Sequence, residues 1–231
     1  MSFAARPIGL VKGEFVFDDV IASDVTNYNL RARAVAAGWD QVVPLVATTT
    51  VNSGIVLSAD STSQYAFDTG ATFPAGTTLT LINNGFVIGM GGAGGAAYTD
   101  GSNGGPALRA QYAIGIDAAG GVIGGGGGGG GGGVIGGGGG GRSGRTNAAG
   151  ASGGASGTFS SGGSGGGGGG GAGGTTGPGG GGSGGDGGGG GGWGASGGNT
   201  GYYAGGTGGA AVVGNSYITW INTGTRYGAI T

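Results

Sequence analysis

Residues 121–141 read GVIGGGGGGGGGGVIGGGGGG, and the state that this glycine adopts determines the architecture of the chain. Glycine-rich sequence surrounds it from about Gly89 to Gly214. Further glycine runs occupy residues 165–171, 179–182 and 187–192. Three states are open to such sequence: a flexible coil, a collagen triple helix, or a bundle of polyproline-II-type glycine helices.

The collagen helix is excluded, because it needs glycine at every third position and abundant proline. Here the glycines are consecutive, and the 231 residues include 74 Gly and only 5 Pro. Ordering glycine costs ~1–2 kcal/mol per residue, whereas a backbone hydrogen bond returns ~0.5–1.5 kcal/mol, so a lone glycine rod is unstable. Glycine helices that share bonds on several sides, with apolar anchors at their ends, can be stable. We expect this bundle, with a flexible coil as the alternative.

The composition excludes several classes of function. With 8 Lys and Arg, 10 Asp and Glu and a net charge of -2, the chain has no basic surface for nucleic acid. It has no apolar run long enough to insert in a membrane, and its N-terminus lacks the pattern of a signal peptide. It contains no Cys and no His, so we expect no disulfide, no metal site and no cofactor.

An enzymatic function is the weakest prediction. The acidic residues are scattered along the sequence, and no paired-carboxylate site can be argued from Asp18, Asp19, Asp60, Asp68 or Asp100. We therefore predict no catalytic residues and no enzyme. A depolymerase whose carboxylates meet only in the folded chain is the enzymatic alternative.

The N-terminal region predicts a short strand at residues 15–17 and a helix from Val25 to Ala37, with Ser23 or Asp24 as N-cap and Gly38 at the C′ position. The two arginines of this helix are either solvated charges or partners for acidic groups on another protein. Candidate residues for docking a partner are Phe15, Phe17, Tyr28, Arg31, Arg33 and Trp39.

Short β-favouring runs follow, separated by turns that contain Gly, Asn or Pro. They lie at residues 42–46, 55–57, 65–67 and 79–82. A pattern of an apolar strand, an Asn/Asp turn with glycine and a second apolar pair recurs at residues 79–89, 113–124 and 217–228. The pattern resembles the coils of a β-solenoid and predicts that the glycine segments are long excursions between stacked coils. Chance similarity of Asn-Gly turns is the alternative.

Large side chains in the glycine region fall between the glycine runs, where a rod would reverse direction. Aromatic residues with Asn, Ser and Thr on loops are typical of binding surfaces. Candidate binding residues are Tyr98, Asp100, Asn103, Arg142, Arg145, Phe159, Trp193, Asn199, Tyr202 and Tyr203. The alternative is that these side chains only cover the ends of the bundle.

Two segments resemble glycine-rich tail-tip and tail-fibre proteins of tailed bacteriophages: NYNLRARAVAAGWD at residues 27–40 and GNSYITWINTGTRYG at residues 214–228. The resemblance covers about residues 27–231. The glycine region is also similar in kind to the distal adhesins of T-even-like phages, which implies a polyglycine-II sandwich whose loops contact an outer-membrane receptor. The attachment domain of those adhesins is not recognisable in residues 1–40, and no binding residue carries over by motif.

We predict a mostly β and irregular fold, with a small N-terminal helix-and-strand region, short β-solenoid-like strands and a polyglycine-II helix bundle. The predicted domains are an attachment region at residues 1–40, a β anchor at 41–89, a glycine domain with receptor-facing loops at 90–214 and a closing β segment at 215–231.

The predicted function is that of an adhesin in the virion, at the distal end of the tail. The N-terminal region would dock to a tail hub or fibre protein, and the loops would recognise a bacterial outer-surface receptor, either a protein or a polysaccharide. We also expect a homo-oligomer, a trimer. The alternatives are a minor tail component that only spaces or plugs, and an ice-binding protein, although the glycine tracts lack the regular small or Thr positions that ice binding needs.

Overall fold

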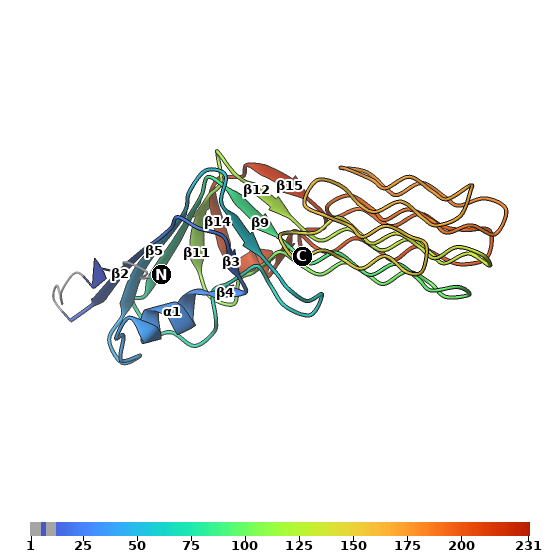
Figure 1. Ribbon diagram of the computed structural model, residues 1–231. Helices are drawn as coiled ribbons and strands as arrows, with labels where there is room; N and C mark the ends of the chain where they lie inside the picture. The colour runs from blue at the N-terminus through green and yellow to red at the C-terminus, as the bar shows by residue number, and fades with distance from the viewer. Residues whose placement is uncertain (1–5, 8–12) are drawn as a thin grey trace.

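The computed structural model describes residues 6–7 and 13–231 and shows a chain with two parts (Figure 1). One part, here called the body, is built from β-sheets and comprises residues 13–88, 108–124 and 212–231. The other part comprises residues 89–107 and 125–211, here called the glycine segments, which extend side by side from the body (Figure 1).

Three sheets form the body. The six-stranded sheet contains, in spatial order, β1 (Arg6–Pro7), β2 (Phe15–Ile21), β5 (Leu45–Val51), β8 (Thr78–Asn83), β11 (Ile114–Asp117) and β14 (Ile218–Asn222). The five-stranded sheet contains β15 (Thr225–Tyr227), β12 (Val122–Gly124), β9 (Phe86–Ile88), β6 (Val56–Ser58) and β3 (Val25–Thr26). The four-stranded sheet contains β13 (Val212–Val213), β10 (Leu108–Arg109), β7 (Phe67–Asp68) and β4 (Tyr28–Asn29).

The chain visits the six-, five- and four-stranded sheets in turn, and each circuit stacks on the one before. Among the described strands, β1 and β2 are antiparallel, and the neighbours within the rest of the three sheets are parallel. The recurring sequence pattern is visible in this register, because Ile114 of β11 lies beside Leu79 of β8 and Ile218 of β14.

Alternating side chains of the six-stranded sheet make the core of the body. In β5 every second residue is buried, and the same inward row continues with Leu79 and Leu81 of β8 and with Ile114 and Ile116 of β11. A single circuit cannot bury its own apolar face, so the stacked circuits supply one another with a core.

The body contains the α-helix α1 (Leu30–Ala36) and a short 3-10 turn η1 (Asn215–Tyr217) among the described residues. The prediction of a helix from Val25 was wrong at its start, because β3 and β4 occupy the first residues and pair with β6 and β7. The N-cap is Asn29, whose side chain accepts a hydrogen bond from Ala32, while Asp24 accepts one from the amide of Val56. Gly38 follows the helix with φ of +106°, as the sequence predicted.

Backbone hydrogen bonds hold the glycine segments together, and in the central segment they repeat every third residue. The amides of Gly126, Gly129 and Gly132 donate to Gly105, Ser102 and Thr99 on one neighbouring segment. The amides of Gly127, Gly130 and Gly133 donate to Arg142, Gly139 and Gly136 on another. The amides of Gly125, Gly128 and Gly131 donate to Tyr227, Ala195 and Gly198. The buried central segment is therefore bonded on several sides.

The predicted fold class was wrong. The structure consists mostly of three parallel sheets with one α-helix, and it shows no helix bundle in the described residues. Within residues 125–211 the chain has no assigned helix or strand. The sequence correctly suggested ordered glycine with apolar anchors, but composition does not specify the local conformation that packed glycine adopts.

A substitution at Gly129 tests how closely these segments approach. A Cβ atom built on Gly129 would lie 1.9 Å from the carbonyl oxygen of Ala93. We expect Gly129→Ala to destabilise the protein by ~1–3 kcal/mol, since the neighbouring backbone must move. Gly168→Ala is the matched control, because its Cβ would meet nothing within 4 Å. Thermal unfolding measures both variants, and equal melting temperatures would contradict close packing at Gly129.

Candidate functional site

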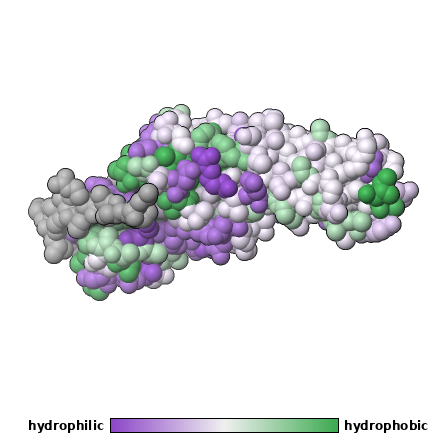
Figure 2. Space-filling model, viewed as in Figure 1, coloured by the Kyte–Doolittle hydropathy of each residue, from purple (hydrophilic) through white to green (hydrophobic). Residues whose placement is uncertain are grey.

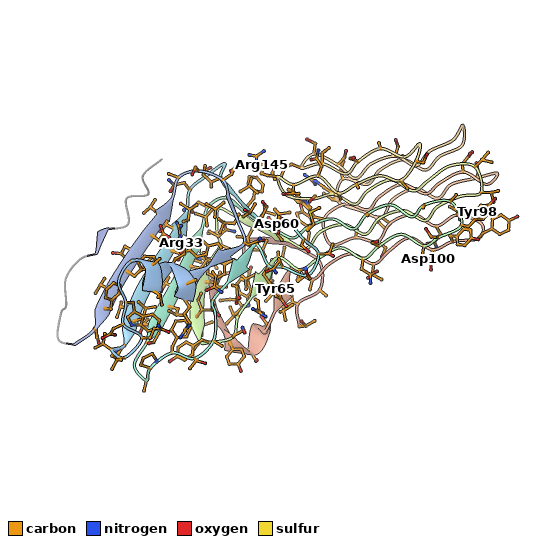
Figure 3. All side chains as sticks on the ribbon, turned by 60° about the horizontal axis from the view of Figure 1, so that its bottom comes forward. Arg33, Asp60, Tyr65, Tyr98, Asp100 and Arg145 are labelled. Atoms are coloured by element: carbon orange, nitrogen blue, oxygen red, sulfur yellow. The ribbon has the colours of Figure 1, made fainter. Side chains whose placement is uncertain are left out.

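The glycine segments reverse direction at two ends, and the turns at the end away from the body include four that lie side by side and carry the larger side chains of that end. These turns, here called the tip, comprise residues 96–99, 133–136, 183–186 and 200–203. The amide of Tyr98 donates to Gly133, and the amide of Ile135 donates to Gly185. Figure 3 shows Tyr98 and Asp100 at this far end.

The tip exposes aromatic and aliphatic side chains. Tyr202 is 75% exposed and Ile135 is 74% exposed. The ring of Tyr98, also exposed, meets Tyr203 edge to face with a centroid separation of 6.4 Å. Figure 2 shows hydrophobic surface at this end, beyond nearly neutral surface over the rest of the glycine segments. A shallow hollow of about 490 Å³ lies at the tip between Val134, Ile135, residues 182–185, Gly201 and Tyr202.

Polar side chains near the tip fix the backbone of neighbouring segments. Asp100 accepts a hydrogen bond from the amide of Ala204 at 2.8 Å. Asn103, part-way along its segment, accepts one from Thr207, and Asn199 accepts one from Gly205, each at 2.9 Å. These acceptors brace the turns that carry the exposed tyrosines.

The tip carries little charge. The charged residues of the glycine segments are Asp100, Arg142, Arg145 and Asp186. Asp186 is buried and accepts the amide of Gly169 at 2.6 Å, and both arginines lie at the body. Contacts made by the tip would therefore depend mainly on apolar surface and neutral hydrogen bonds, with the exposed carboxylate of Asp100 beside them.

Trp193 lies in a buried cluster where the glycine segments meet the body, and this place is here called the junction. It is 5% exposed and packs against Phe86 and Tyr227 of the body and against Phe159. Its indole nitrogen donates to the carbonyl of Ser143 at 3.1 Å. The predicted binding residues Trp193 and Phe159 are thus part of the junction and not of the tip.

Both arginines among the predicted binding residues also lie at this junction. The guanidinium of Arg142 stacks 3.4 Å from the ring of Trp193 and donates to the carbonyls of Phe159 and Thr175. Burial lowers the pKa of Arg142 from its usual value. Arg145, labelled in Figure 3, forms an ion pair with Asp24 of the body at 2.7 Å.

Three of the predicted docking residues, Phe17, Tyr28 and Trp39, are buried in the core of the body. Burial, with a smaller contribution from Asp19, raises the pKa of Tyr28, whose hydroxyl donates to the Asp19 carboxylate. These side chains support the surface from beneath rather than form it.

The other three docking candidates lie nearer the surface. Arg33 pairs with Asp19 at 3.2 Å, and Arg31 donates to Gln41 and to the carbonyl of Thr72. Phe15 is half-buried and packs against the core. The intramolecular partners of both arginines lie within the body.

Sequence reasoning missed Val134 and Ile135 as residues of the tip. They are the apolar pair that interrupts two glycine runs. An aliphatic pair that interrupts two long glycine runs marks a turn, and this sequence signal could have identified them.

The described residues contain no group of three or more acidic side chains that could hold a metal ion. Within residues 6–7 and 13–231 no helix has the length and apolar character needed to span a membrane.

Comparison with known proteins gives two similarities. The family model described as "Phage tail fibre adhesin Gp38" matches residues 17–231. The crystal structure of the gp37-gp38 adhesin tip complex of the bacteriophage S16 long tail fibre superposes with a TM-score of 0.67 and 22% sequence identity, over 93% of this chain and 82% of that chain. At 22% sequence identity, the structural similarity shows that the two chains share a fold. A comparison with curated proteins found no match.

The different burial of Trp193 and Tyr202 predicts different effects on stability. We expect Trp193→Ala to lower the free energy of unfolding by ~3–5 kcal/mol, because it empties a buried aromatic site. Tyr202→Ala should change it by no more than ~0.5 kcal/mol, because the ring is exposed. Denaturant unfolding of both variants measures the difference, and similar losses would contradict the assignment of Trp193 to the junction.

Proposed function

The chain belongs to the Gp38 family of phage tail fibre adhesins, and from this premise we propose that its tip contacts a receptor on the bacterial surface while its body attaches to the tail fibre. Membership of the family confirms the predicted location in the virion, at the distal end of the tail fibre. It also confirms the sequence-based recognition of a tail-fibre adhesin.

The exposed side chains of the tip carry this proposal. Glycine offers a receptor only backbone, whereas the tip presents Tyr98, Ile135 and Tyr202 to solvent on turns braced by hydrogen bonds. Aromatic side chains such as Tyr are enriched among the residues that supply most of the binding energy in protein recognition, because they offer a large rigid surface. The tip is thus the surface that is best suited to bind.

The proposed receptor is a molecule of the bacterial outer surface, either a protein or a polysaccharide, as expected from the sequence. Of the ten predicted binding residues, we propose Tyr98, Tyr202 and Tyr203 as direct contacts. Asp100, Asn103 and Asn199 support them through the backbone bonds described above. We propose structural roles for the four residues at the junction.

The partner on the phage side is the tail-fibre protein. The structural neighbour was crystallised as a complex of an adhesin with a second protein of a long tail fibre, and this supports an analogous attachment here. The protein acts by binding, and no catalytic step is part of the proposal. The predicted trimer and the predicted domain boundaries remain proposals.

The test is adsorption of virions that carry Ile135→Ser with Tyr202→Ala. We expect adsorption to the host to fall about tenfold or more, since both exposed anchors are removed. Thr176→Ala is the control, because it changes an exposed side chain on a turn at the other end of the glycine segments.

Assembled virions that adsorb normally with the altered tip would contradict the proposal. That result would favour a component that only spaces or plugs the tail.

A further inference from the structure

We propose that the tail fibre docks on one corner of the body, formed by the connections from the four-stranded sheet to the six-stranded sheet. The inference rests on the proposed function, in which the body attaches to the fibre. The connections precede β5, β8, β11 and β14. Four apolar side chains on these connections that are exposed or half-buried, here called the docking corner, are Val42, Phe73, Tyr112 and Tyr217.

Aromatic rings from three successive connections pack against one another at this corner. The ring of Phe73 lies 5.6 Å from that of Trp39 and 4.9 Å from that of Tyr112, measured between centroids. The indole of Trp39 donates to the carbonyl of Val43 at 2.8 Å. Buried Trp39 therefore supports a row of rings that the stacked circuits hold in fixed positions.

The apolar row is open to solvent and has a polar border. Val42 is 76% exposed, and Phe73 and Tyr112 are half-buried. Arg31, which donates to Gln41, and Asp40 lie beside the row. Hydrogen bonds from the amides of Val42 and Val43 lower the pKa of Asp40. An apolar centre with a polar rim is the usual anatomy of a protein interface.

The position of the corner identifies the occupant. The glycine segments leave the body after β9 and β12 and return at β10 and β13, so they occupy a different corner. Figure 1 shows α1 and the loop that follows it at the end of the molecule away from the glycine segments. An adhesin that contacts a cell through its tip must be held from the other end. The Val42 end of the docking corner therefore faces the fibre when the tip faces the cell, and the row continues from there along the body to Tyr217 in η1.

The chemistry of the corner defines the fibre surface that fits it. Aromatic and aliphatic side chains offer no ion pair at their centre, so the fibre must present apolar groups of its own, with hydrogen-bonding groups at the edge. A second copy of this chain could also cover an apolar row, and the experiment below separates these two occupants.

The experiment measures binding of the full chain to the tail-fibre protein of the phage that encodes it. We expect Val42→Asp to weaken binding about tenfold or more, because a carboxylate placed within an apolar contact is desolvated without a partner. Tyr217→Asp gives a second variant at the same corner. Two matched controls replace exposed aliphatic residues elsewhere on the body: Val20→Asp, 60% exposed in β2, and Ile221→Asp, 58% exposed in β14.

Weaker binding by both corner variants, with unchanged binding by both controls, supports the proposal. Full binding by Val42→Asp, or loss confined to Val20→Asp or Ile221→Asp, overturns the assigned corner. Size-exclusion chromatography of the chain alone adds a further criterion, because self-association abolished by Val42→Asp would assign the corner to a second copy. If the unaltered chain fails to bind the fibre protein, the proposed attachment itself is wrong. Adsorption by tip variants tests receptor binding separately.

Discussion

Backbone hydrogen bonds between glycine segments are the interaction on which the extended part of the molecule depends. They form only if the segments approach so closely that most side chains would collide with a neighbouring carbonyl oxygen, as a Cβ on Gly129 would with Ala93. Each bond contributes only ~0.5–1.5 kcal/mol, so order requires that the amides of the central segment be satisfied on several sides at once. The long glycine runs are therefore a steric requirement of the architecture.

The body supplies what glycine cannot, which is a hydrophobic core that fixes the ends of the segments. The segments are inserted between β9 and β10 and between β12 and β13, so each begins and ends on strands that the stacked circuits hold in register. Trp193 and Arg142 strengthen this attachment by packing on each other beside Phe86. Because the ends are fixed, less conformational entropy is left for the backbone bonds to overcome.

The sequence predicted the internal repeat and the adhesin, since strand periodicity and two distinctive segments are local properties. It failed for the helix start, where pairing of Val25 with Leu57 overrides a helical pattern. It also failed to predict the conformation of packed glycine, because a residue without a side chain carries no periodic signal. The predicted binding residues lie in two different places, and the sequence did not separate them for a third reason. Composition marks Trp193 and Tyr202 alike as turn residues, and only the folded chain shows that one turn meets the body and the other meets solvent.

The two kinds of turn differ in the constraints that they place on substitution. A turn at the body must fit its surroundings, and Trp193 illustrates this because it packs between Phe86, Phe159 and Tyr227. A turn at the tip packs against other tip turns and solvent, so Ile135 and Tyr202 contribute little to folding. The side chains of these turns contribute few of the bonds that hold the segments together, since most of those bonds join backbone to backbone. The scaffold thus separates stability from recognition, and residues of the tip can change the surface offered to a receptor without changing the bonds beneath it.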